Sequence, residues 1–269
     1  MILQNKIIPL RELPLRSDFM FGEVMRTSEI CQLFLEELLG ISIQHIEFID
    51  KQKELSDSYT HHGIRLDVYL KDEAGTVFNV EMQSARDGDL AKRARYYQGA
   101  IDRSELPKGE DYEKLSKSYV IFVCDFDYFR IGKAVGERVS LLKGTETIYD
   151  DGSHVFFLNS RYTEGNASRS ILEFLDMIRT NDLEKTYETP LGQKAKARVQ
   201  AVRCDKELEV SYMTIAQKML DERRQGFKEG HAEGLNEAIA ALKGLLEPVV
   251  IAERFNVPLE RVLRILEQS

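Results

Sequence analysis

The residues best suited to chemistry are two carboxylates, Asp67 and Glu81, in neighbouring segments that alternate apolar and polar side chains. Apolar residues occupy every second position in 64–70 and in 78–82, a period of two that is typical of β-strands with one buried face. Between them, 73–75 (Glu-Ala-Gly) suits a three-residue hairpin loop in which glycine adopts the left-handed conformation. The sequence therefore predicts a β-hairpin of two half-buried strands that carries both acids on its polar face.

The length of this loop sets the register of the hairpin. Counting back from it places Asp67 opposite Glu81 and Arg65 opposite Gln83, with the Cβ atoms of each pair roughly 4.5–5.5 Å apart. Two like charges that close destabilise a fold unless a cation lies between them, and Mg²⁺ accepts one or two carboxylates together with waters and phosphate oxygens. The pair is thus either a divalent metal site or two solvated charges on an exposed sheet face.

Several motifs of this chain resemble those of a known family. Asp67, then thirteen residues, then Glu81-Met82-Gln83 is similar to the signature of the PD-(D/E)XK nuclease superfamily. The likeness is to its recombination-promoting nuclease/putative transposase branch, in which glutamine replaces the usual lysine. Segments 17–21, 93–97 and 109–112 are similar to further motifs of that branch and occur in the same order, so the resemblance covers about residues 14–180. Gly22 departs from it, because we expect a lysine there in the opening motif.

The resemblance implies a metal-dependent DNA endonuclease that hydrolyses phosphodiester bonds and is linked to recombination or transposition. It assigns Mg²⁺, with Mn²⁺ as a substitute, to the side chains of Asp67 and Glu81 and to the backbone carbonyl of Met82. Gln83 would hydrogen-bond the attacking water or the scissile phosphate. Since a neutral amide is neither a base nor a positive charge, we expect slower chemistry than at a lysine site.

The first predicted helix offers a further catalytic acid. Asp18 is the main candidate, and Glu23 is the other. Asp18 also suits the N-terminal cap of that helix, so both interpretations of this residue stay open.

Contact with DNA has to come from a local surface, because the whole chain has a net charge of −8 and non-specific affinity for DNA comes mainly from neutralised phosphates. Residues 86–103 hold five basic side chains against three acidic ones, which favours a modest basic rim. The candidate DNA contacts are Arg86, Lys92, Arg93 and Tyr96. An ordinary solvated helix face is the alternative for the last three. We therefore expect DNA affinity that is weak or dependent on metal.

Composition limits the other classes of function. A chain of 269 residues with 43% hydrophobic content can bury one ordinary core and a small second unit. Neither a run of the ~20 apolar residues that a membrane span needs nor the apolar core of a signal peptide is present, so we expect a cytoplasmic protein without a membrane partner. Cys31, Cys124 and Cys204 are far apart and odd in number, which indicates reduced thiols. His61 and His62 lack zinc-site spacing and suit a surface loop.

The elements that must position the acids follow the order αβββαβ, which predicts an α/β (α+β) fold with a mixed central sheet flanked by helices. The resemblance implies the same restriction-endonuclease-like core. The run 119–124 is continuously apolar, as expected for a central strand buried on both faces. Helices are expected in 17–39 (ending at Gly40), 89–104 and 168–179, and other strands in 44–50, 134–142 and 155–158.

A change in composition near Thr186 predicts a nuclease-like domain in residues 1–185 and a helical region in 186–269. Thr189 and Pro190 suit the cap and first residue of a helix. Glycines that recur every four residues indicate either a flexible linker or a close helix–helix contact; they are Gly226, Gly230 and Gly234.

The last apolar stretch, 249–266, predicts two short helices around Asn256. They are either half of a helix-turn-helix motif or a helical hairpin used for packing or self-association. Two alternatives to an active nuclease stay open. The first is a catalytically weak or inactive nuclease-fold protein that binds DNA or self-associates. The second is an interaction module that forms a homodimer through the C-terminal helices.

Overall fold

The computed structural model describes residues 2–3, 6–49, 67–86 and 88–268. The predictions about His61, His62 and Arg65 concern residues outside these ranges. The chain divides into two compact units, one of residues 9–209 and one of residues 1–8 with 210–269. The first unit continues past the boundary expected near residue 186, because helix α5 (Pro190–Cys204) packs against helices that precede it in the chain.

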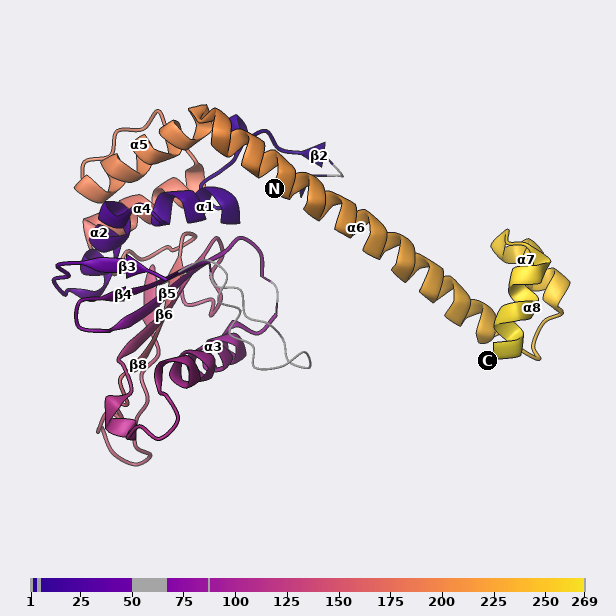
Figure 1. The fold of residues 1–269 in the computed structure, drawn as a ribbon, viewed down its shortest axis with the longest axis horizontal. Helices are drawn as coiled ribbons and strands as arrows, with labels where there is room; N and C mark the ends of the chain where they lie inside the picture. The colour runs from indigo at the N-terminus through magenta and orange to yellow at the C-terminus, as the bar shows by residue number, and fades with distance from the viewer. Residues whose placement is uncertain (1, 4–5, 50–66, 87, 269) are drawn as a thin grey trace. The chain divides into compact units, whose positions relative to one another are not determined.

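A six-stranded mixed sheet forms the centre of the first unit (Figure 1). Its order is β3-β4-β5-β6-β8-β7, in which β5, β6 and β8 are parallel and the remaining neighbours are antiparallel. The strands are β3 (Ile46–Phe48), β4 (Val68–Asp72), β5 (Val77–Gln83), β6 (Ser118–Cys124), β7 (Val135–Glu137) and β8 (Ser153–Asn159). The predicted mixed α/β fold is confirmed.

The hairpin β4–β5 has the predicted register. Val68 pairs with Val80 and Leu70 with Phe78. Extending this register by one residue before β4 places Asp67 opposite Glu81. The loop is the three-residue type, with Gly75 in the left-handed region at φ 80°. The expectation of two half-buried strands is wrong for β5, which is buried along its whole length, because this strand is central and helices cover both faces of the sheet.

Helix α3 (Leu90–Glu105) covers the face that carries Glu81. Its apolar residues Leu90, Ala94 and Ile101 pack in one cluster with Phe122 of β6, and its bounds agree closely with the helix predicted in 89–104. Figure 1 shows α3 on one side of the sheet and a layer of other helices on the opposite side. This layer contains α1 (Asp18–Met25), α2 (Ser28–Leu39), α4 (Arg169–Thr180) and α5.

Local signals in the sequence set the ends of these helices. The hydroxyl of Ser17 accepts a hydrogen bond from the Met20 amide at 3.4 Å, so Ser17 and not Asp18 is the cap of α1. Gly40 ends α2 in the left-handed conformation at φ 66°. Thr189 caps α5 ahead of Pro190, as predicted. Two short 3₁₀ turns complete the unit, η1 (Leu10–Glu12) and η2 (Tyr112–Lys114).

The segment after β6 differs from the expectation. The strand predicted in 134–142 is limited to the three residues of β7 at the sheet edge, whereas β8 is longer than predicted and lies between β6 and β7. Because β8 runs parallel to β6 and in register with it, the carboxyl ends of β5, β6 and β8 lie side by side.

The second unit contains most of the long helix α6 (Lys206–Ala240), together with α7 (Pro248–Phe255), α8 (Leu259–Gln268) and the short strands β1 (Ile2–Leu3) and β2 (Lys6–Ile7). The three recurring glycines lie inside α6, and apart from their neighbours in the helix no described atom lies within 4 Å of the place that a Cβ would take on any of them. The described part of the chain is therefore helical at these glycines and packs no other segment against them. Ile239, Ile251 and Val262 join the end of α6, α7 and α8 in one apolar cluster.

Candidate active site

The hairpin brings the two predicted acids together at the end of β5. Glu81 Oε1 accepts a hydrogen bond from the backbone amide of Asp67 at 3.2 Å, and Asp67 Oδ2 accepts one from the amide of Met82 at 3.1 Å. Each carboxylate is thus tied to the backbone of the opposite strand. This reciprocal pairing holds both acids at one edge of the sheet, as the hairpin register predicts.

Burial and like charge act together on Glu81. Only 3% of this residue is exposed, because β5 is central and α3 packs over it. Burial first, and then the negative charge of Asp67, raise the pKa of Glu81 to about 8. The hydrogen bond from the Asp67 amide and the charge of Arg93 act in the opposite direction. The pair is therefore not two solvated surface charges, and a bound cation would relieve the repulsion between them.

Gln83 is held by a basic residue of α3. Arg93 Nη1 donates to Gln83 Oε1 at 2.9 Å, and Arg93 Nη2 lies 4.0 Å from Glu81 Oε2. Since its oxygen accepts this bond, the side-chain amide of Gln83 is oriented with its NH₂ group as the donor. The structure places Arg93, an expected DNA contact, beside both predicted catalytic residues of β5, and its role in DNA binding stays a prediction.

Two aromatic rings support the guanidinium of Arg93. Its centre lies 5.5 Å from the ring centroid of Tyr97 and 5.7 Å from that of Phe122, within the range of cation–π attraction. Arg93 Nη2 also donates to the Tyr97 hydroxyl at 3.1 Å. Burial, and then the charge of Glu81, raise the pKa of Tyr97, so this residue is a neutral donor at the site. Tyr97 lies in the segment 93–97 that resembles a family motif, but it is not among the predicted site residues.

The backbone of Asp67 is bound by a second arginine, at the end of α1. Arg26 Nη2 donates to the carbonyl oxygen of Asp67 at 3.0 Å. The guanidinium lies where a side chain on Gly22 would begin, since a Cβ on that glycine would be 2.8 Å from Arg26 Nη1. The resemblance predicts a lysine at residue 22. Glycine there leaves room for the guanidinium of Arg26, which is one helical turn later in the chain.

Of the two acids expected from the first helix, Glu23 is engaged in ion pairs. Its carboxylate lies 3.6 Å from Arg26 Nη1 and 3.5 Å from Arg198 Nη2 of α5. Asp18 is exposed in the first turn of α1. Its role as a catalytic acid stays a prediction.

The other predicted DNA contacts lie near the start of α3. Arg86 donates to the carbonyl oxygens of Asp127 and Tyr128, which ties the segment before α3 to the loop after β6. Lys92 pairs with Asp89 at 3.2 Å on the surface of α3, and Tyr96 is exposed on the same helix. The role of these residues in DNA binding stays a prediction.

The donor set at the hairpin fits Mg²⁺. Within the described ranges, no group of three or more His, Cys, Asp or Glu side chains could hold a metal ion, and the carboxylates that the hairpin brings together are those of Asp67 and Glu81. Mg²⁺ is commonly bound by one or two carboxylates, with waters and substrate phosphate oxygens in the other positions. The repulsion that raises the pKa of Glu81 favours such a cation. The assignment of the Met82 carbonyl stays a prediction.

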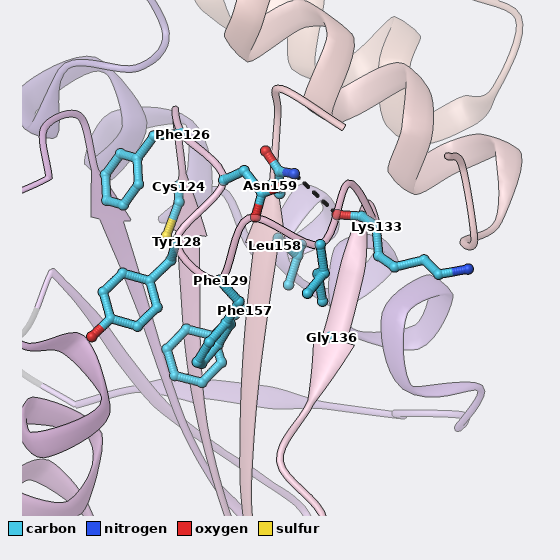
Figure 2. Close-up of a pocket in the computed structure, with 11 residues that line it drawn as sticks. Cys124, Phe126, Tyr128, Phe129, Lys133, Gly136, Phe157, Leu158 and Asn159 are labelled. Atoms are coloured by element: carbon cyan, nitrogen blue, oxygen red, sulfur yellow. Dashed lines mark hydrogen bonds between the residues drawn. The ribbon is translucent and has the colours of Figure 1, made fainter. Parts of the chain in front are cut away.

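A cavity of about 20 Å³ lies beside the ends of β6 and β8 (Figure 2). Cys124, Tyr128 and Phe157 are among its lining residues, and Asn159 Nδ2 at its rim donates to the carbonyl of Lys133 at 3.1 Å. Burial raises the pKa of the Cys124 thiol to about 12, so this sulfur is not a nucleophile at neutral pH. A space this small holds about one water and is not a nucleotide pocket.

Comparison with known proteins places this geometry in a family. The family model described as PD-(D/E)XK nuclease family transposase matches residues 16–225, a span that contains the hairpin, α3 and all of the predicted site residues. No curated protein and no solved structure matches the chain. No helix in the described part of the chain is long and apolar enough to cross a membrane. The chain belongs to the PD-(D/E)XK nuclease family transposases.

Proposed function

We propose that this protein is a Mg²⁺-dependent endodeoxyribonuclease, with Mn²⁺ as a substitute, that hydrolyses phosphodiester bonds of DNA in recombination or transposition. The observation that carries the proposal is the pair of acids, Asp67 and Glu81, held by reciprocal backbone hydrogen bonds at the edge of the sheet. Membership of a nuclease-type transposase family supports DNA as the substrate. We further propose that the protein acts in the cytoplasm.

Each site residue has a role in this proposal. Asp67 and Glu81 hold Mg²⁺, which supplies positive charge to the phosphoryl oxygens when it is bound. Gln83 donates from its NH₂ group to the scissile phosphate or to the attacking water. Arg93 fixes that amide and adds the positive charge that a neutral glutamine lacks. The two tasks of a lysine are thus divided here: the amide of Gln83 on β5 donates the hydrogen bond, and the guanidinium of Arg93 on α3 supplies the positive charge.

Burial makes these residues effective. Electrostatic interactions are stronger in a site from which water is excluded, and α3 covers Glu81 and Gln83. The stacking of Arg93 on Tyr97 and Phe122 keeps its charge in place before substrate arrives. The chain therefore has a pre-positioned cation next to the acids, in spite of its net charge of −8.

Cleavage of supercoiled plasmid DNA tests the proposal. The purified full chain is incubated with Mg²⁺ or with EDTA, beside the isosteric variants Asp67→Asn and Glu81→Gln. Asp176→Asn is the matched control, because Asp176 is a buried acid on α4 in a separate ion-pair network. We expect nicking that requires Mg²⁺, is lost in both hairpin variants and persists in the control.

Two results would contradict the proposal. Cleavage by the hairpin variants at the wild-type rate would remove the site assignment. Folded wild-type protein that binds DNA but never cuts it with Mg²⁺ or Mn²⁺ would favour the alternative, a nuclease-fold protein that acts by binding alone.

A further inference from the structure

Three charged residues form a cluster that the cleavage chemistry does not use. Arg161 donates from Nε and Nη2 to the two carboxylate oxygens of Asp125, at 3.0 and 3.1 Å. Arg16 Nε lies 3.6 Å from Asp125 Oδ2, and the hydroxyl of Ser160 donates to Oδ1 at 2.7 Å. One carboxylate therefore fixes two guanidinium groups, and the cluster keeps a net positive charge.

The cluster lies on the edge of the sheet that carries the site. Gln83, Cys124 and Asn159 are aligned across the parallel strands β5, β6 and β8. Asp125 follows Cys124, and its backbone amide donates to the carbonyl of Gln83 at 2.9 Å. Arg161 follows Asn159 by two residues, so its strand lies two strand spacings, about 10 Å, from Gln83. Ligands of open α/β sheets bind outside the carboxyl ends of the strands, which is where these groups are.

Exposure distinguishes the two arginines from the acid that holds them. The side chain of Asp125 is 7% exposed, whereas those of Arg16 and Arg161 are 39% and 47% exposed. A cluster that only joined chain segments would not need a second cation open to solvent. A guanidinium group has five donors in a rigid fork that matches the geometry of phosphate, and Arg161 uses only two of its nitrogens on Asp125.

We propose that Arg16 and Arg161 bind the phosphate backbone of the DNA strand beside the scissile phosphate, and that Asp125 is a positioning residue for both. This inference rests on the proposed function for the identity of the ligand. The two arginines come from before α1 and after β8, so they add two segments to the DNA-binding surface expected from α3.

Equilibrium binding of a fluorescein-labelled 20-base-pair duplex tests the inference. Fluorescence anisotropy is measured in EDTA over a series of salt concentrations, with the full chain and the double variant Arg16→Gln/Arg161→Gln. The matched control is Arg138→Gln, which removes the same kind of charge from the opposite end of β8, where Arg138 Nη2 donates to Ser153. We expect the double variant to bind roughly tenfold more weakly, with a log–log salt slope reduced by about two, and the control to match the wild type.

Asp125→Asn and Arg16→Lys/Arg161→Lys separate phosphate binding from a purely structural role. If the arginines contact phosphates, Asp125→Asn binds the duplex at least as tightly as wild type, and the lysine variant stays within about threefold of wild type at low salt, because lysine keeps the charge. If the cluster only joins segments, Asp125→Asn and the glutamine variant lose affinity together, in step with their melting temperatures. That outcome overturns the inference.

A parallel plasmid-cleavage assay keeps this inference distinct from the proposed function. If the glutamine variant binds DNA more weakly but the wild-type protein never cuts DNA, the phosphate site stands and the nuclease assignment is wrong. If the wild-type protein cuts DNA but the glutamine variant keeps the wild-type affinity and salt slope, only the phosphate site is wrong. Absence of measurable binding by wild type also overturns the inference.

Discussion

Glu81 and Asp176 are both buried acids of the first unit, but their surroundings are opposite. Among the residues that the structure describes, Glu81 has a second carboxylate, Asp67, beside it and the guanidinium of Arg93 4.0 Å away. Asp176 of α4 is bound by two cations, Arg179 and Lys185. Burial alone would raise the pKa of Asp176, but the hydrogen bonds from Lys185 and Arg179 outweigh it, and the pKa lies below its usual value. The pKa of Glu81 is raised to about 8.

Such a difference is expected between a catalytic acid, the role that we propose for Glu81, and an acid that serves stability. Asp176 joins α4 to the segment before α5 and has its charge balanced within the chain. Burial and the charge of Asp67 make ionisation of Glu81 costly, and a bound cation would offset that cost. Sites that need an external ligand commonly keep such an imbalance, and substitution should therefore have opposite consequences at the two acids.

The largest expected effect is on cleavage. Glu81→Gln should lower the rate of plasmid nicking by roughly 10³-fold, the scale seen when electrostatic stabilisation of a transition state is removed, whereas Asp176→Asn should change it by less than about threefold. Initial rates at saturating Mg²⁺ measure both. Equal losses in the two variants would show that buried acids matter here only through the fold.

Substitution of Arg93 tests the cation that lies beside Glu81. Arg93→Met should lower kcat roughly 10–100-fold, as loss of an outer-shell partner commonly does, with a smaller change in KM, and Arg93→Lys should recover part of that loss. Arg95→Met on the exposed side of the same helix removes the same charge and is the control. A loss confined to KM would instead return Arg93 to the role of a DNA contact.

The pH dependence of stability should have opposite signs at the two acids. Because the fold raises the pKa of Glu81 from 4.5 to about 8, the folded protein holds a proton that the unfolded chain releases, and this contribution to stability is lost as pH rises toward 8. Thermal unfolding in EDTA should show Glu81→Gln gaining several degrees over wild type at pH 8 and little at pH 5, where about 2–4 °C corresponds to 1 kcal/mol in a protein of this size. Parallel curves for the two proteins would contradict the raised pKa.

The smallest expected effect is on the stability contributed by Asp176. Asp176→Asn should lower the free energy of unfolding by about 1 kcal/mol at pH 7, since the partner cations are partly exposed. The pKa of Asp176 is lowered from 3.8, so wild type should lose this advantage as pH falls below about 4. Urea unfolding at pH 7 and pH 3 measures the difference. A larger difference at pH 3 than at pH 7 would reverse the assigned sign.

The sequence predicts well what depends on neighbours in the chain. The loop at Gly75 and the period of two in the strands define the hairpin register, and with it the opposition of Asp67 and Glu81. The cap at Thr189 and the end of α2 at Gly40 depend on one or two residues each. In all of these the deciding contacts lie within a few residues.

Contacts between distant segments were harder to predict. The burial of Glu81 depends on how α3 packs over β5, and alternation along a strand does not distinguish a polar face in water from one beneath a helix. The bond from Arg26 to Asp67 joins residues 41 positions apart. Arg93 and Tyr97 were visible as an i, i+4 pair, but the direction in which that pair points depends on the rotation of α3. The length and position of β8 likewise depend on its partner β6.

The close approach of the Arg26 guanidinium to Gly22 links two positions of α1 into one unit of substitution. A lysine at residue 22 would displace the guanidinium of Arg26 from its present position, and a shorter residue at 26 would remove the hydrogen bond from Arg26 to the Asp67 carbonyl. Relatives with lysine at the first position should accordingly carry a smaller or differently directed side chain four residues later. A comparison that scores each position separately would count two unrelated changes. Together, the two changes move one positive charge from residue 22 to residue 26.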